Sequence, residues 1–317
     1  MTTGFSGIFP AVVTPFTIQR QFAEDAFERL LDSLYSAECD GVYVCGQTGE
    51  GLLQSPEMRK QVAEASVRMS PPGKSVIVHV GSSSTIDSVA LATHAESIGA
   101  AAISSLPPLG GYSFDEVRTH YEALAAATKL PVYVYYFPEI APSIATLDHI
   151  LDLCSIPSVA GLKFTDFDLF KLSRIKAAGK TVFNGRDEVL VAGLLMGADG
   201  GIGSIYNLVP NLFVELYRMA RQSRWDDACR VQIRINELIS ILLRFPLIPV
   251  IKTLLKWSGV DCGECLSPRG VLSTEQQREL RELLEHSSFS GATGELLHSR
   301  VGASGLGKFD TRQQSRG

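Results

Sequence analysis

The stretch Val159-Ala160-Gly161-Leu162-Lys163-Phe164-Thr165 is a short apolar run with a lysine near its end. A run of this length and composition is typical of a strand buried on both faces. Similar runs recur on both sides of it, and an amphipathic helical stretch follows each. The predicted strands lie at residues 7–13, 41–45, 75–79, 101–104, 132–136, 159–163, 181–184 and 200–203. The predicted helices lie at residues 23–37, 56–69, from 84, from 113, 146–153, 169–177, 188–196 and from 210.

Eight strand-helix units with near-continuous apolar strands predict a closed parallel sheet wrapped by helices. The predicted fold class is therefore α/β, a (β/α)8 TIM barrel. An open doubly wound sheet is the alternative, but no G-x-G-x-x-G follows the first strand. After residue 223 the period is lost, and helices at 225–245, 248–257 and 274–286 predict a C-terminal helical extension. We expect a catalytic barrel over residues 1–223, the extension over 224–287 and a disordered, Gly/Ser-rich tail over 288–317.

The chain has 317 residues, 45% of them hydrophobic, which fits one large barrel domain. Its net charge of −5, without a long basic block, argues against nucleic acid or an anionic membrane as a partner. The N-terminus has neither the basic nor the apolar region of a signal peptide, so we expect no export and no membrane insertion. The six scattered cysteines predict reduced thiols in a cytosolic protein. Cys262 and Cys265 form a lone C-x-x-C, which we interpret as ordinary thiols rather than a redox or zinc site.

Lys163 is the residue whose chemistry points to a function. An amine in apolar surroundings loses part of its preference for the charged form, and a neutral amine attacks ketones to form a Schiff base. Most lysines are solvated, so this interpretation depends on the neighbouring residues. Tyr135 ends the preceding strand at the same mouth of the barrel, where active sites of this fold lie. Its phenol is suited to relaying protons, although ordinary packing also explains a tyrosine there.

Polar residues follow three other strands at this mouth. Gln47 and Thr48 lie in a glycine-rich turn that directs backbone N–H groups and a hydroxyl toward an oxyanion such as a carboxylate, or is simply a βα turn. Acceptors for a polyhydroxylated substrate are expected from Gly185, Asp187, Glu188 and Ser204. Acidic pairs are also common at helix N-termini, which is the alternative explanation for Asp187 and Glu188.

Together these residues resemble the class I, pyruvate-dependent aldolase superfamily of N-acetylneuraminate lyase and dihydrodipicolinate synthase, over roughly residues 7–286. The resemblance implies that Lys163 forms a Schiff base with pyruvate, that Tyr135 relays protons, and that Gln47 and Thr48 occupy the pyruvate carboxylate site. Three segments look like the matching segments of sialic acid lyases: residues 161–166, 184–188 and 197–207. That likeness implies that the sugar's hydroxyl chain is bound by Thr165, Gly185, Asp187, Glu188 and Ser204. The family resemblance also implies a homotetramer.

Two features depart from the family pattern, and a third departs from the synthases. Gln47 stands where Ser or Thr is usual. Leu109 and Gly110 replace an aromatic pair, one member of which reaches the neighbouring subunit's site. Ile140 stands where the synthases usually carry an arginine that holds the aldehyde substrate's carboxylate.

We therefore expect a cytosolic lyase that cleaves N-acetylneuraminate, or a similar 2-keto-3-deoxy sugar acid, to pyruvate and an aldehyde such as N-acetylmannosamine. Its partner is a small keto acid, and no metal or organic cofactor is expected. One alternative keeps the Schiff base but performs synthase or dehydratase chemistry on another keto acid. The other is a non-catalytic sugar-acid-binding protein.

Overall fold

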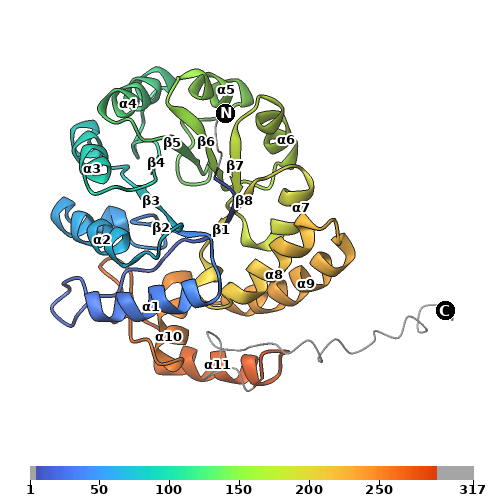
Figure 1. Cartoon of the computed structure of the whole chain (residues 1–317). Coiled ribbons are helices and arrows are strands. Elements are labelled where there is room, and N and C mark those ends of the chain that lie inside the picture. The colour runs from blue at the N-terminus through green and yellow to red at the C-terminus, as the bar shows by residue number, and fades with distance from the viewer. Residues whose placement is uncertain (1–4, 291–317) are drawn as a thin grey trace.

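The structure is a computed structural model that describes residues 5–290. Its eight strands are parallel and lie in the order β1-β8-β7-β6-β5-β4-β3-β2 (Figure 1). The ring closes just beyond the end of β1, where Ala11 pairs with Tyr43 of β2 and the Val12 N–H donates to the Tyr43 carbonyl at 2.9 Å. The predicted (β/α)8 TIM barrel is confirmed.

The strands are β1 (Gly7–Pro10), β2 (Gly41–Val44), β3 (Ser75–His79), β4 (Ala102–Ser105), β5 (Val132–Tyr136), β6 (Val159–Phe164), β7 (Thr181–Asn184) and β8 (Gly200–Gly203). The helices around them are α1 (Glu24–Ser36), α2 (Pro56–Met69), α3 (Thr85–Ser97), α4 (Phe114–Ala127), α5 (Leu147–Ser155), α6 (Leu169–Ala177), α7 (Leu190–Leu195) and α8 (Pro210–Arg221). Short 3-10 turns are η1 (Gly51–Leu53), η2 (Asp187–Val189) and η3 (Ile205–Asn207).

Local sequence signals explain where several helices begin. The Ser55 hydroxyl accepts a hydrogen bond from the Met58 N–H, and Pro56 occupies the first helical position of α2. Ser113 and Glu116 form a reciprocal capping box at the start of α4. Each cap gives a partner to a backbone N–H that has none within the helix.

Several predicted bounds differ from the structure by one to three residues, and two of them are instructive. The first strand ends at Pro10 rather than residue 13, because the Val13 N–H donates to the Asn207 side chain instead of continuing the ladder. The helix predicted at 188–196 begins as η2, and α7 itself starts at Leu190.

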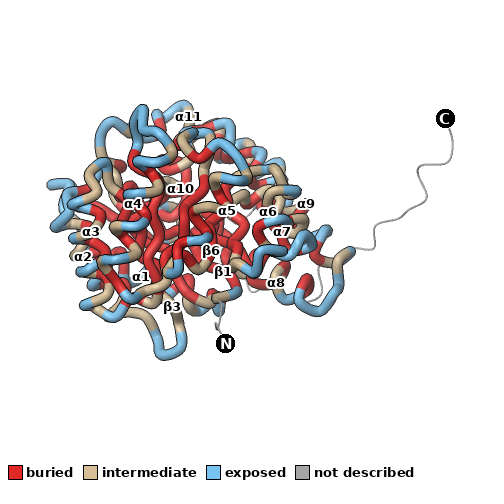
Figure 2. The backbone as a smooth tube through the Cα atoms, turned by 90° about the horizontal axis from the view of Figure 1, so that it is seen from above, coloured by how far each residue is buried: buried red, intermediate tan, exposed pale blue. Residues whose placement is uncertain are grey.

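Buried side chains form two layers, inside and outside the ring of strands. Figure 2 shows the buried residues gathered in the middle of the molecule and the exposed ones along its periphery. The inner layer fills the barrel with residues such as Phe9, Tyr43, Tyr133, Phe183 and Ile202. The outer layer packs between the strands and the helices. Since side chains fill a barrel of eight strands, room for a ligand lies at its ends.

Three further helices follow the barrel: α9 (Trp225–Leu242), α10 (Leu247–Trp257) and α11 (Thr274–Glu285). Figure 1 shows α9 alongside α8, and Figure 2 shows α11 at one edge of the molecule. The predicted division at residue 224 falls between α8 and α9; that residues 224–287 form a unit of their own stays a prediction. Of the predicted tail, Phe289 is buried, while residues 291–317 lie outside the described residues.

No single helix within residues 5–290 is long and apolar enough to cross a membrane. The α9–α10 pair meets that criterion only when taken together, and it bends by 107° at its break.

Candidate active site

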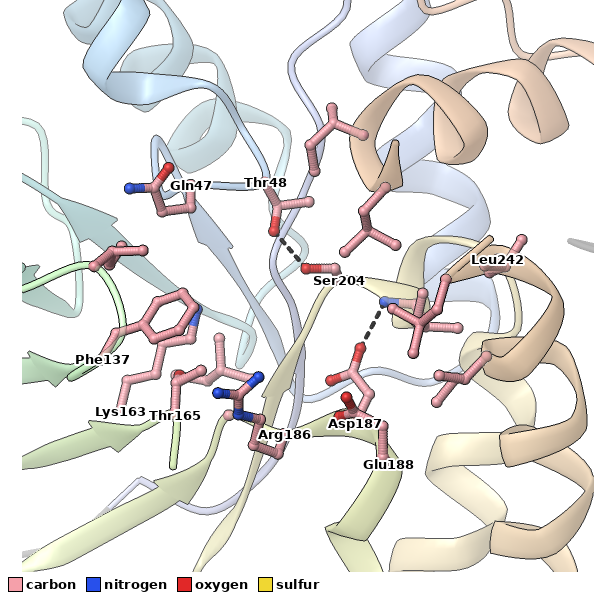
Figure 3. Close-up of a pocket in the computed structure, with 18 of the residues that line it drawn as sticks. Gln47, Thr48, Phe137, Lys163, Thr165, Arg186, Asp187, Glu188, Ser204 and Leu242 are labelled. Atoms are coloured by element: carbon pink, nitrogen blue, oxygen red, sulfur yellow. Dashed lines mark hydrogen bonds between the residues drawn. The ribbon is translucent and has the colours of Figure 1, made fainter. Parts of the chain in front are cut away.

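A cavity of about 290 Å³ opens at the carboxyl ends of the strands (Figure 3). The structure brings all nine residues singled out from the sequence to its wall: Gln47, Thr48, Tyr135, Lys163, Thr165, Gly185, Asp187, Glu188 and Ser204. They come from β2, β5, β6, β7 and β8 or from the turns that follow these strands. Their individual roles stay predictions.

Lys163 lies on β6 between Tyr135 of β5 and Phe183 of β7. Its side-chain nitrogen Nζ is 4.0 Å from the centre of the Tyr135 ring and 4.6 Å from that of Tyr43. The residue is 4% exposed, and this burial lowers its pKa to about 7, although the carboxylate of Asp187 opposes the shift. A large share of the amine is therefore neutral at neutral pH, which is the state that attacks a ketone.

Tyr135 is likewise enclosed, with 3% of its surface exposed. Burial raises the pKa of its phenol well above the usual 10, while the nearby charge of Arg186 acts in the opposite direction. The phenol therefore holds its proton until a reacting oxygen is close, as an acid in a proton relay does.

The turn after β2 carries Gln47 and Thr48. The Thr48 and Ser204 hydroxyls lie 2.6 Å apart and join this turn to the end of β8 (Figure 3). Gly49 packs tightly, since a Cβ there would lie 2.9 Å from the Val12 carbonyl oxygen. Residues on both sides of the turn, Cys45 and Glu50, take positive φ angles of 60° and 57°. The turn is thus fixed tightly against the barrel.

His79 supports the same turn from beneath, which the sequence did not indicate. The Leu106 N–H donates to its Nε2 at 3.0 Å, so Nδ1 carries the proton and donates to the Cys45 carbonyl at 3.1 Å. The buried guanidinium of Arg59 donates in turn to the His79 carbonyl at 2.6 Å. Burial lowers the pKa of His79, which keeps the ring neutral.

The turn after β7 places Asp187 inside the cavity wall rather than at an exposed rim. Its Oδ2 accepts from the Ile205 N–H at 2.8 Å, and its Oδ1 is buried with no hydrogen-bond partner in the part of the chain that the structure describes. Burial raises the pKa of Asp187 to about 7. Glycine is required at Gly203, where a Cβ would lie 1.9 Å from Asp187 Oδ1, and at Gly185, where it would lie 2.2 Å from Thr165 Oγ1.

Helix α9 holds this turn through two polar side chains that were not predicted. Gln232 is 4% exposed; it accepts from the Val191 N–H at 3.0 Å and donates to the Asp187 carbonyl at 2.9 Å. Asn236, one helical turn later, donates to the Glu188 carbonyl at 2.9 Å. The C-terminal helices therefore help to shape the cavity.

Other lining residues were also missed. Arg186 lines the cavity, although only its neighbours Gly185, Asp187 and Glu188 were predicted to do so. Arg269, in the loop between α10 and α11, also lines the cavity. An apolar wall comes from α9, α10 and the link between them. Its residues are Ile239, Leu242, Leu243, Leu247 and Ile248. Apolar periodicity predicts that such residues are buried, but it does not tell a core contact from a cavity wall.

The loop after β4 does not contribute to this cavity. Leu109 and Tyr112 are 38% and 40% exposed, and neither lines the cavity. Within one copy of the chain, this loop therefore brings no aromatic side chain to the cavity in place of the pair missing at Leu109 and Gly110.

All six cysteines are free thiols, and Cys262 and Cys265 are buried. Among the described residues, no group of three or more His, Cys, Asp or Glu side chains is arranged to hold a metal ion.

The dihydrodipicolinate synthetase family matches residues 4–287. The N-acetylneuraminate lyase of Rhizobium meliloti (strain 1021) is 36% identical over 279 residues, which cover 87% of this chain and 93% of that protein. The protein of the same name from Salmonella agona (strain SL483) is 35% identical, covering 84% and 93%. Among solved structures, a catalytic lysine mutant of Ruminococcus gnavus sialic acid aldolase superposes with a TM-score of 0.85 at 27% identity, covering 89% of this chain and 95% of that one.

Proposed function

Because the chain belongs to the dihydrodipicolinate synthetase family, we propose that it is a Schiff-base lyase. It cleaves N-acetylneuraminate, or a similar 2-keto-3-deoxy sugar acid, to pyruvate and an aldehyde such as N-acetylmannosamine. The observation that carries this proposal is the amine of Lys163, buried in the cavity with a pKa of about 7. Two relatives named N-acetylneuraminate lyase support it, and so does the likeness to the catalytic lysine mutant of Ruminococcus gnavus sialic acid aldolase.

The reaction begins when neutral Lys163 attacks the C2 ketone and the carbinolamine loses water to give an iminium. A base, Tyr135 or the substrate carboxylate beside it, removes the proton of the C4 hydroxyl. The C3–C4 bond then breaks, its electron pair moves into the iminium to form an enamine, and C4 leaves as an aldehyde. Protonation at C3 and hydrolysis release pyruvate and the free amine. The iminium is the electron sink, so this chemistry requires neither a metal nor an organic cofactor.

The polar residues divide between the two halves of the substrate. We assign the C1 carboxylate to Gln47 and Thr48, because their turn offers a hydroxyl and backbone N–H groups. We assign the hydroxyl chain beyond C4 to Thr165, Gly185, Asp187, Glu188 and Ser204, which lie at the ends of β6, β7 and β8. The buried Asp187 Oδ1, which has no hydrogen-bond partner among the described residues, is ready to bond to a substrate hydroxyl.

Borohydride trapping tests the nucleophile. Reduction in the presence of pyruvate should add one pyruvyl mass to a peptide that contains Lys163. The Lys163→Ala variant should give no adduct and no turnover, whereas Lys129→Ala, which removes an exposed lysine, should behave like the wild type. An adduct on another lysine, or turnover by Lys163→Ala, would reject the assignment.

A substrate panel then separates the lyase from the alternatives. Pyruvate release from sialic acids and from 2-keto-3-deoxygluconate is expected, whereas consumption of pyruvate with aspartate semialdehyde would indicate a synthase. Gln47 does not by itself distinguish a lyase from a synthase. Its long side chain is expected to crowd the site of the pyruvate carboxylate. Gln47→Ser should therefore preserve or improve pyruvate affinity.

The proposal also includes the oligomeric state of the protein and its location in the cell. We infer a cytosolic homotetramer, and the exposed Leu109 and Tyr112 in the loop after β4 support a subunit contact there. Sedimentation equilibrium of the wild type and of Leu109→Asp tests the contact; the aspartate should weaken association.

A further inference from the structure

Arg186 places a positive charge on the wall of the cavity, and the proposed reaction has not used it. Its side chain is 14% exposed, and its guanidinium carbon lies 5.3 Å from the Phe137 ring centre and 4.4 Å from that of Phe167. Figure 3 shows the guanidinium directed into the cavity between Thr165 and Asp187. The two aromatic rings orient the side chain there, as cation–π contacts do.

Much of the bonding capacity of this guanidinium is free. Among the described residues, Glu139 is its one acceptor, bonded to Nη2, and Nε is buried without a hydrogen-bond partner. Glu139 is 59% exposed, so solvent screens its attraction for the arginine. Arginine presents several donors in a planar fork that fits a carboxylate or a phosphate, and a partly buried one favours such an anion.

The position of Arg186 shows which half of a substrate it would meet. β7 lies three strands from β2 around the barrel, beyond β8 and β1. Figure 3 accordingly shows Gln47 and Thr48 on one side of the cavity and Arg186, Asp187 and Glu188 on the other. A substrate attached to Lys163 with its C1 carboxylate at Thr48 therefore extends its aldehyde half toward Arg186.

We propose that Arg186 determines specificity by binding an anionic group on the aldehyde half of the substrate. The preferred substrate is then a 2-keto-3-deoxy sugar acid with a second acidic group, a carboxylate or a phosphate, beyond C4. This inference rests on the proposed Schiff-base lyase and deepens it.

The acidic residues nearby are compatible with such a ligand. Asp187 has a pKa raised to about 7 by burial, so much of it carries no charge at neutral pH. Glu188 lines the same part of the cavity, where hydroxyl groups of the sugar chain have donors to offer. Arg269, on the wall formed by the C-terminal loop, adds a second cation to the cavity.

Three unreactive sugar acids show the effect of a second negative charge on binding. Gluconate, glucarate and 6-phosphogluconate have similar hydroxyl chains and differ at C6, which is a hydroxymethyl, a carboxylate or a phosphate ester. None has a ketone, so binding measured by calorimetry does not depend on Lys163 chemistry. Glucarate, 6-phosphogluconate or both should bind about ten-fold or more tightly than gluconate, as a bond to a charged group predicts. Which of the two is preferred identifies the anion.

The matched variants are Arg186→Met and Arg174→Met. Arg174 is an exposed arginine on α6 that does not line the cavity, so its loss changes the net charge equally. Arg186→Met should reduce the preference for the charged ligands to less than about three-fold, Arg186→Lys should restore part of it, and Arg174→Met should leave it unchanged. Equal binding of all three acids by the wild type, or an unchanged preference in Arg186→Met, would overturn the proposal.

A second measurement connects binding to turnover. Condensation with pyruvate should be faster, in kcat/KM, for glyceraldehyde 3-phosphate or tartronate semialdehyde than for glyceraldehyde, and Arg186→Met should remove this difference. Absence of a pyruvate adduct at Lys163 would reject the lyase itself, while the binding ratios would still decide the role of Arg186. A normal adduct with no preference for charged acceptors would reject the role of Arg186 alone.

Discussion

Schiff-base formation at Lys163 should follow pH with a midpoint near 7. Burial lowers the pKa of this amine to about 7 from a usual 10.5. At pH 7 about half of the protein then carries a neutral amine, compared with roughly 0.03% for an exposed lysine. The cavity therefore supplies on the order of 1,600 times more reactive amine at that pH.

The assay is the rate of pyruvate-dependent trapping with cyanoborohydride, followed by mass spectrometry between about pH 5 and about pH 10. Deprotonation creates the nucleophile, so the rate should rise with pH and level off above the midpoint. A midpoint close to 10 would refute the argument, because it would mean that burial does not perturb Lys163.

Asp187→Asn shows which group produces the rise. The Asp187 carboxylate raises the pKa of Lys163, so its removal should move the midpoint below that of the wild type while the rise itself persists. Asp187 also has a pKa near 7, so loss of the rise in this variant would assign the midpoint to Asp187 instead. An upward shift would contradict the proposed interaction between the two groups.

Three further substitutions test the support of the site. Glu50→Gln leaves Lys252 buried without the carboxylate that lies 2.8 Å from it, and should lower the free energy of unfolding by about 3–5 kcal/mol in urea titrations. Gln232→Leu deprives one buried and one partly buried backbone group of their partners and should lower the free energy of unfolding by about 2 kcal/mol, with reduced turnover. Gly203→Ala sets a methyl group against Asp187 and should destabilise by about 1–3 kcal/mol while pyruvate still forms its adduct. Wild-type stability in any of the three would show that the contact removed does not support the fold.

The fold was predictable because its signals are local and repeated. Each barrel strand is buried on both faces and is therefore a short apolar run, and helices begin at recognisable caps such as Ser55 and Ser113. Strand order then brings Lys163 beside Tyr135 without further information, since sequential units of a barrel are neighbours.

The remaining features of the site depend on contacts between distant parts of the chain. Gln232 is a polar residue on an amphipathic helix, and only the packed structure shows it buried against the Asp187 turn, 45 residues away. The first turn after β7 is the 3-10 turn η2 rather than an α-helix. The Asp187 carboxylate in this turn accepts a hydrogen bond from the Ile205 N–H, which belongs to η3. The direction of the Arg186 side chain depends on its contacts with Phe137 and Phe167, which follow β5 and β6.

The reacting groups of the cavity and its apolar wall come from separate stretches of sequence. The nucleophile Lys163 lies on β6 and Tyr135 lies on β5. The apolar wall comes instead from residues 239–248, which lie in α9, in α10 or between them. Substitutions in this C-terminal stretch can reshape the space for the aldehyde without touching the amine that makes the covalent bond. A lineage with this architecture can acquire new substrates by drift in one segment of its gene, and an engineer can do the same by exchanging that segment between relatives.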